Sequence, residues 1–187
     1  IFLTNEEVKQ FVDSIKLETL DGRVNINGLR FRTLVEVLLG TGMRISECLS
    51  LNQDSIDFEK REAKIVGKGN KERTVFFSER SLHWVKLYLE HREDSANPLF
   101  ITYNQTRLPR YDISKTFQNY VKHSGLKKKV TPHILRHTVA TQLLFNGCPI
   151  SHVKEILGHE RLETTCAYYL GVDKRKAKEA HGKYLNF

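Results

Sequence analysis

The chain has 187 residues, of which 40% are hydrophobic and 28% are charged, and this composition suits one compact unit with its own core. Its net charge of +8 is regional: residues 1–106 hold 15 Lys and Arg against 16 Asp and Glu, whereas residues 107–187 hold 15 against 6. A regional excess of positive charge favours a polyanion such as nucleic acid as partner, with a scattered solvated surface as the alternative. No apolar run approaches the roughly 18 residues of a membrane-spanning helix, which excludes that class.

The three cysteines indicate a reducing compartment. Cys48, Cys148 and Cys166 are odd in number, widely spaced and set in apolar segments with helical spacing. We therefore expect buried packing roles rather than disulfides, in a soluble cytosolic protein without a secretory signal. The chain begins at Ile1 and enters a helix almost at once, so we expect a fragment of a longer protein.

The N-terminal part predicts helices separated by a loop. Thr4 and Glu7 make a capping box for a first helix, whose apolar residues follow helical spacing. Residues 19–28 are rich in turn formers and predict a loop. A second helix is predicted over about 29–41, ending at a glycine, and a short third helix over about 44–50.

The middle of the chain changes its hydrophobic period. The stretch EAKIVGKGNKERTVFF has two β-rich arms around a Gly-Lys-Gly-Asn turn, which predicts a β-hairpin. Further helices, several of them ended by glycines, are predicted over about 79–92, 112–124, 132–146, 149–157, 162–169 and 173–184. The expected fold class is mainly α with a small antiparallel β-sheet.

The segment PHILRHTVATQLL gathers imidazole and guanidinium groups at the start of a helix. Thr131 and Pro132 make a good N-cap and first-turn pair, which places His133, Arg136 and His137 in the first two turns on one face. Amides at a helix N-terminus and an arginine favour an anion such as phosphate, and an imidazole there can exchange a proton. The alternative is structural, with the histidine bonded to a loop and the arginine paired with a carboxylate.

A metal site is a second alternative, because His133 and His137 have the i, i+4 spacing of helical zinc ligands. The segment HILRH has Leu and Arg where a zinc protease has glutamate, and the adjacent arginine would repel a cation. Cys148 and His152 have a similar spacing, but the apolar stripe around them favours packing. We therefore expect no metal.

Four segments in one order carry a resemblance to a known family. The segments LLGTGMRISECLSL (38–51), GKGNKER (67–73), HILRH (133–137) and LGHERLETTCAYY (157–169) together resemble the catalytic domain of the tyrosine recombinases, most closely Xer-type recombinases and phage or transposon integrases. The resemblance covers nearly the whole chain. It implies the tyrosine recombinase catalytic-domain fold for residues 1–187, as the C-terminal part of a longer protein whose N-terminal core-binding domain is absent from this chain.

The resemblance also implies a set of functional residues. Glu47 matches the family's acidic residue that supports the site, and His137 is a supporting residue, in packing or beside the site. Lys68 matches the mobile lysine that gives a proton to the leaving oxygen, and His133 the group that accepts the tyrosine proton. The implied catalytic residues are Arg44, Lys68, His133, Arg136, His159 and Tyr168.

The nucleophile is chosen between two adjacent tyrosines. In the resembling family the tyrosine follows the Gly-His histidine by nine positions, which selects Tyr168 over Tyr169. On a helix the next side chain points about 100° away, so both hydroxyls cannot reach one phosphate from the same backbone position. Tyr169 stands where Xer-type proteins commonly have a small polar residue, and it remains the alternative.

The implied reaction is cleavage and rejoining of DNA strands through a 3′-phosphotyrosyl intermediate, with no metal, ATP or other cofactor. The implied partners are double-stranded DNA and a homotetramer on paired sites, with a related recombinase or accessory protein as a further partner. Two other functions stay open, namely a type IB topoisomerase-like enzyme and a catalytically idle DNA-binding accessory protein.

Residues 170–187 are a candidate segment for docking between protomers, or alternatively a solvated or DNA-facing surface. Phosphate contacts, which give affinity and salt sensitivity rather than sequence readout, are expected from a basic set. The expected DNA-binding residues are Lys71, Arg73, Arg107, Arg110, Lys115, Lys122, Lys127, Lys128 and Lys129, with Lys71 and Arg73 on the DNA backbone or in solvent.

Overall fold

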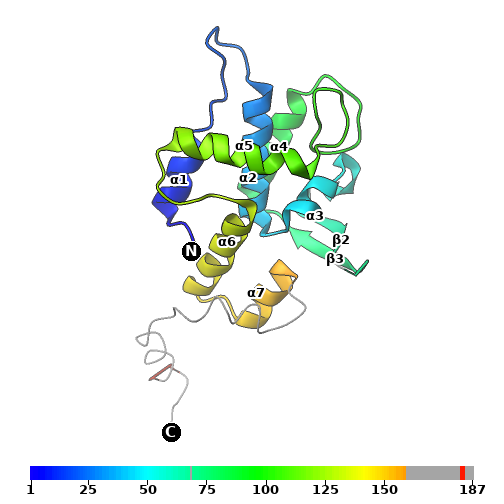
Figure 1. The fold of residues 1–187 in the computed structure, drawn as a ribbon. Helices are drawn as coiled ribbons and strands as arrows, with labels where there is room; N and C mark the ends of the chain where they lie inside the picture. The colour runs from blue at the N-terminus through cyan, green and yellow to red at the C-terminus, as the bar shows by residue number, and fades with distance from the viewer. Residues whose placement is uncertain (68, 159–181, 184–187) are drawn as a thin grey trace.

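The structure, a computed structural model, describes residues 1–67, 69–158 and 182–183. This part of the chain is mainly helical with one small antiparallel sheet, which confirms the predicted fold class (Figure 1). The predicted helix 162–169 lies outside the described residues, as does the predicted helix 173–184 apart from 182–183. The elements are α1 (Asn5–Asp13), α2 (Ile26–Thr41), α3 (Ile45–Ser50), a 3-10 turn η1 (Gln53–Ser55), β1 (Ile56–Asp57), β2 (Glu62–Val66), β3 (Glu72–Phe76), α4 (Glu79–Glu90), α5 (Arg110–Ser124), α6 (Pro132–Phe145) and α7 (Ile150–Leu157).

The helices begin and end at the capping residues that the sequence supplies. The predicted capping box of α1 is formed: Glu7 N donates to Thr4 Oγ1 over 3.2 Å, and Thr4 N donates to Glu7 Oε2 over 2.8 Å. At α6, Thr131 Oγ1 accepts from Ile134 N, with Pro132 in the first turn. Left-handed glycines follow the helices as predicted, at Gly42, Gly125, Gly147 and Gly158.

Two predicted helix starts were wrong by a few residues. Helix α2 begins at Ile26 rather than 29, because the side chain of Asn25 caps it by accepting from Gly28 N over 3.1 Å. Helix α5 begins at Arg110 rather than 112, directly after Pro109, whose extended backbone forms the N-cap position.

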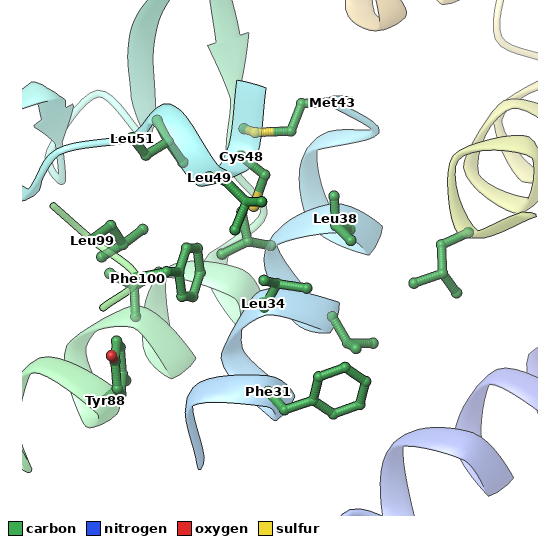
Figure 2. Close-up of a cluster of buried hydrophobic side chains, with 14 of the residues drawn as sticks. Phe31, Leu34, Leu38, Met43, Cys48, Leu49, Leu51, Tyr88, Leu99 and Phe100 are labelled. Atoms are coloured by element: carbon green, nitrogen blue, oxygen red, sulfur yellow. The ribbon is translucent and has the colours of Figure 1, made fainter. Parts of the chain in front are cut away.

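Helix α2 lies at the centre of the main core and packs against α4 and α6. Figure 2 shows Phe31, Leu34 and Leu38 along α2, with Cys48 of α3 toward the end of this row that is opposite Phe31. Tyr88 of α4 and Phe100 of the loop after it complete the cluster. Cys48 is fully buried, so its packing role is confirmed, and burial raises the pKa of its thiol. The core therefore fixes α3, whose first turn carries the candidate site.

The sheet has the order β1-β2-β3, and its β2–β3 pair is the predicted hairpin, whereas β1 was not predicted. In the hairpin register Ala63 faces Val75 and Ile65 faces Arg73. Ala63, Ile65 and Val75 are buried, so this face of the sheet packs on the core. Because side chains alternate along a strand, Arg73 lies on the same face.

Helices α6 and α7 form a smaller apolar cluster of Ala140, Leu144, Val153 and Leu157, with Cys148 at its edge. In Figure 1, α7 lies between α6 and the hairpin. The contact with the hairpin is made by Arg73, whose Nη1 donates to the carbonyl oxygen of Ile156 over 3.1 Å. The end of α7 is thus held between two elements that carry predicted site residues.

Candidate active site

Three consecutive carbonyl groups at the end of α7 accept hydrogen bonds from three different arginines. Ile156 O accepts from Arg73 (3.1 Å), Leu157 O from Arg136 (2.7 Å) and Gly158 O from Arg44 (3.3 Å). The last carbonyls of a helix lack intrahelical partners and carry partial negative charge, so cations are stabilised there. The end of α7 therefore brings together three guanidinium groups from distant parts of the sequence.

Arg136 is the most enclosed of the three, with 7% of the residue exposed. Its Nη1 donates to Gly42 O and its Nη2 to Leu157 O, each over 2.7 Å. The side chain thereby joins the end of α2 to the end of α7. Its position in the second turn of α6 is set by the Thr131 cap and Pro132.

Arg44 is the N-cap residue of α3 and is bound to Glu47 one turn later. Its Nη1 lies 3.1 Å from Glu47 Oε1, and its backbone N donates to Glu47 Oε2 over 2.8 Å. The Glu47 side chain is only 4% exposed, whereas that of Arg44 is 36% exposed. The pair therefore consists of a buried carboxylate and a guanidinium that reaches solvent.

Glu47 also binds Arg73, whose Nη2 lies 2.9 Å from its Oε2. Burial would raise the pKa of this carboxyl group, but the hydrogen bonds from Arg73 and the Arg44 backbone, with the charges of both arginines, lower it below its ordinary value. Glu47 is therefore ionised at neutral pH and holds both arginines.

The placement of Arg73 corrects one prediction. It was expected on the DNA backbone or in solvent, yet its side chain is only 15% exposed and its guanidinium bonds Glu47 and Ile156 O. The physical reason is its register in β3, which places it on the core face with Val75. The alternation of Arg73, Val75 and Phe77 in the sequence is the signal that could have shown this.

The hairpin loop projects beside this cluster. Gly67 N donates to Lys71 O over 2.8 Å, and Gly69 and Asn70 take the left-handed conformations that close the turn. Lys71 is exposed, whereas Lys68 lies outside the described residues. A cleft of about 400 Å³ opens between the hairpin and α3 and is lined by Arg44, Ser46, Glu47, Ser50, Val66 and Gly67.

The two histidines of α6 lie in different surroundings. His133 is exposed in the first turn of α6, one turn before Arg136 on the same face. The ring of His137 is half-buried and stacks on Phe2, with the centroids 6.3 Å apart and the planes at 11°. Burial lowers the pKa of His137, as do the charges of the N-terminus and His133.

Three other predicted site residues, His159, Tyr168 and Tyr169, lie outside the described residues, and so does most of the segment 170–187. The chain leads directly from Gly158 to His159. Gly158 closes α7 with a φ of 65° in the left-handed region. The three arginines therefore bind the residues that immediately precede the predicted histidine.

The predicted DNA-binding residues fall into two groups. Those on or after α5 are mostly exposed, and Lys115 and Lys122 share a face of α5 with Tyr111. Arg107 and Lys128 form the second group, because both also make bonds within the protein. Arg107 bonds Leu49 O, Leu51 O and Asn52 Oδ1, and Lys128 bonds Glu7 Oε2 and Phe2 O. The exposed members of the predicted set are Lys71, Arg107, Arg110, Lys115, Lys122, Lys127 and Lys129.

The described part of the chain offers neither a metal site nor a membrane span. Residues 1–67, 69–158 and 182–183 contain no group of three His, Cys, Asp or Glu side chains that could hold a metal ion. Within the same ranges, every helix is too short or too polar to cross a membrane. The chemistry available to the cluster is that of fixed guanidinium groups, which bind phosphate oxygens and stabilise negative charge that develops on them.

Comparison with known proteins identifies the family of this chain. A family model described as the phage integrase family matches residues 1–176. Tyrosine recombinase XerC of Chlamydia pneumoniae is 34% identical over 163 residues, 83% of this chain and 52% of that protein. Tyrosine recombinase XerC of Chlamydia caviae is 37% identical over 159 residues, 82% of this chain and 51% of that protein. The chain thus spans about half the length of these curated relatives.

Solved structures show the same fold. The crystal structure of XerA recombinase superposes with a TM-score of 0.80 at 27% identity, covering 100% of this chain and 66% of that chain. A pre-cleavage complex of XerH site-specific recombinase with its difH substrate gives 0.78 at 27% identity, covering 100% and 55%. Since the family model matches most of its length and the XerC relatives are similar over more than four fifths of it, the chain belongs to the phage integrase family, the tyrosine recombinases.

Proposed function

We propose that residues 1–187 form the catalytic domain of a site-specific DNA recombinase or integrase that acts on DNA in the cytoplasm. The observation that carries the proposal is the joint placement of Arg44 and Arg136. They come from α3 and α6, yet they bind the adjacent carbonyls of Gly158 and Leu157, directly before His159. The span is supported by the catalytic domain of bacteriophage HP1 integrase, whose fold this chain matches with a TM-score of 0.66 over 94% of that chain.

In the proposed reaction the phenolic oxygen of Tyr168 attacks a DNA phosphorus. A bond forms between that oxygen and phosphorus, the bond to the 5′-oxygen of the next nucleotide breaks, and the DNA is left linked through its 3′-phosphate. His133 takes the proton of the tyrosine, and Lys68 gives one to the leaving 5′-oxygen. Arg44, Arg136 and His159 stabilise the charge on the phosphoryl oxygens, and the chain's own side chains supply every group that these steps use.

Rejoining runs the same steps backwards, with a 5′-hydroxyl group attacking the phosphotyrosine. Exchange of partners therefore needs two duplexes held together, and we assign this to a homotetramer, with a related recombinase or accessory protein as a further partner. Residues 170–187 would supply contacts between protomers. The printed title of the XerH structure describes a recombinase bound to its DNA substrate, which supports DNA as the partner.

The test is the formation of a covalent adduct. The 187-residue chain is incubated with nicked duplexes whose sequence around the nick is randomised, and adducts that survive denaturation are isolated and their DNA sequenced. A 3′-linked adduct with wild type, lost in Tyr168→Phe, is the expected result. The selected duplex then serves as the substrate for every later assay.

Tyr169→Phe is the matched control, because it removes a hydroxyl group one residue away. Loss of the adduct in Tyr169→Phe alone would move the nucleophile to Tyr169. Specific binding without an adduct in wild type would instead support the catalytically idle accessory protein. Relaxation of supercoiled DNA by a monomer, without strand exchange between duplexes, would support the topoisomerase-like enzyme.

A further inference from the structure

Arg73 is an arginine in a position where the sheet otherwise buries apolar side chains. It shares the core face of the hairpin with Ala63, Ile65 and Val75, each at most 5% exposed. A buried charge is costly unless it is paired and hydrogen-bonded. The ion pair and the hydrogen bond that offset this cost identify the elements that the Arg73 side chain links.

Those contacts join three separate elements. Arg73 itself is on β3, its Nη2 binds Glu47 of α3 (2.9 Å), and its Nη1 binds Ile156 O at the end of α7 (3.1 Å). Within the described part of the chain its buried Nε has no hydrogen-bond partner. One side chain therefore links the hairpin, the carboxylate that holds Arg44, and the helix end that precedes His159.

Gly158 fits closely against this guanidinium. A Cβ atom at position 158 would lie 2.5 Å from Arg73 Nε and 2.7 Å from its Cδ and Cζ. A side chain at position 158 would therefore require the Arg73 side chain to shift, and the left-handed φ of 65° also favours glycine. The end of α7 thus packs closely against the Arg73 side chain of the hairpin.

We propose that Arg73 is a positioning residue for DNA cleavage, which acts through Glu47 on Arg44 and through α7 on the residues after Gly158. This role rests on the proposed function. Arg73 orients the carboxylate, and the carboxylate orients the Arg44 guanidinium. Both guanidinium groups also bind carbonyl oxygens at the end of α7, that of Arg73 at Ile156 and that of Arg44 at Gly158. The same side chain ties the hairpin that bears Lys68 and Lys71 to α7.

The test compares Arg73→Gln and Arg73→Lys with wild type and with Arg61→Gln. Arg61 is the matched control, because it is an arginine beside the same sheet whose partner, Glu79 at 2.9 Å, lies outside the cluster. Single-turnover cleavage and equilibrium binding are measured on the selected duplex, with rates normalised to the folded fraction. We expect Arg73→Gln to slow cleavage roughly 10- to 100-fold, by analogy with the loss of a residue that orients a metal ligand. The equilibrium affinity for the duplex should change less than about threefold.

Arg73→Lys separates the two contacts. A lysine at this position keeps a charge for Glu47 but lacks the fork that reaches Glu47 and Ile156 O together. We therefore expect its cleavage rate to lie between those of wild type and Arg73→Gln, while Arg61→Gln cleaves like wild type. Equal rates for wild type and Arg73→Gln would overturn the proposal.

A neutral scissile group distinguishes positioning from a general structural defect. Replacing one non-bridging oxygen by methyl, as a methylphosphonate, removes the negative charge that the arginines meet. If Arg73 acts by placing Arg44, the deficit of Arg73→Gln relative to wild type shrinks on this substrate. An equal deficit on both substrates would refute positioning, whereas absence of any wild-type adduct would refute the proposed function itself.

Discussion

Two groups of the same composition lie in different parts of this molecule and have different consequences. The Glu36 triad consists of Glu36 with Arg32 and Arg80, and the Glu47 triad consists of Glu47 with Arg44 and Arg73. In both, a carboxylate that is 4% exposed binds two arginines at 2.8 to 3.1 Å. The chemistry of the ion pairs is therefore nearly the same.

The two triads differ in the other groups that their arginines contact. In the Glu36 triad, Arg32 donates to Val12 O and stacks over the ring of Trp84, 4.4 Å from its centroid, so the triad joins α1, α2 and α4. In the Glu47 triad the arginines bind the end of α7, and Arg44 borders an open cleft. Glu36 and Arg80 also line a cavity, of about 520 Å³, so a cavity does not separate the two triads. The comparison teaches that a buried Arg-Glu-Arg group beside a cavity does not by itself mark a site, and that the distinguishing feature of the Glu47 triad is the helix end that its arginines bind.

The largest expected effect is on stability, from Glu36→Gln. Removing the carboxylate leaves the Arg32 guanidinium, whose side chain is 8% exposed, without its closest counter-charge, which costs about 3–5 kcal/mol of unfolding free energy. Urea unfolding at neutral pH measures the loss, and Glu79→Gln, which breaks an exposed pair, is the control. The cleavage rate per folded molecule should be unchanged, and a slower rate would show that the two triads are not separate in function.

Arg44→Ala should have the opposite profile. Its side chain is 36% exposed and Glu47 keeps Arg73, so the unfolding free energy should fall by less than about 1 kcal/mol. Cleavage should fall about 10²- to 10³-fold, as for loss of one donor to a developing oxyanion. Single-turnover cleavage at saturating protein measures this, with Arg44→Lys slower than wild type because it loses the fork. Near-normal cleavage by Arg44→Ala would remove the Glu47 triad from the proposed site.

Acid should weaken the Glu47 triad in a defined range. Because the pKa of Glu47 is lower in the folded protein than its ordinary value of 4.5, its ionised form stabilises the fold above that pH. This contribution is lost as the pH falls through the lowered pKa. The difference in unfolding free energy between wild type and Glu47→Gln should therefore be constant from pH 7 to about 5 and shrink below 4.5. A difference that stayed constant down to pH 3 would contradict the assigned charge state.

Structural features set by residues close together in the sequence could be predicted, whereas contacts between residues far apart in the sequence could not. The Thr4 capping box, the Thr131–Pro132 start of α6 and the hairpin follow from local patterns, and all are present. The hydrogen bonds from three arginines to the carbonyl oxygens of residues 156–158 could not be predicted. The bonded residues lie 21 to 114 positions apart in the sequence. The pairing of Lys128 with Glu7, 121 residues away, was missed for the same reason.

The smallest expected effect concerns two adjacent lysines, of which one is exposed and the other is paired with a carboxylate of the protein. Lys127 is exposed, whereas Lys128 Nζ lies 2.8 Å from Glu7 Oε2. A lysine that neutralises a DNA phosphate contributes about −0.9 to the slope of log affinity against log salt concentration. Lys127→Ala should therefore reduce the slope by about this amount, and Lys128→Ala should leave it unchanged while slightly lowering thermal stability. Titrations of the selected duplex between about 50 and 200 mM salt give the slopes. A reduced slope for Lys128→Ala would mean that this lysine leaves Glu7 for the DNA backbone, so that the sequence-based assignment of Lys128 would hold after all.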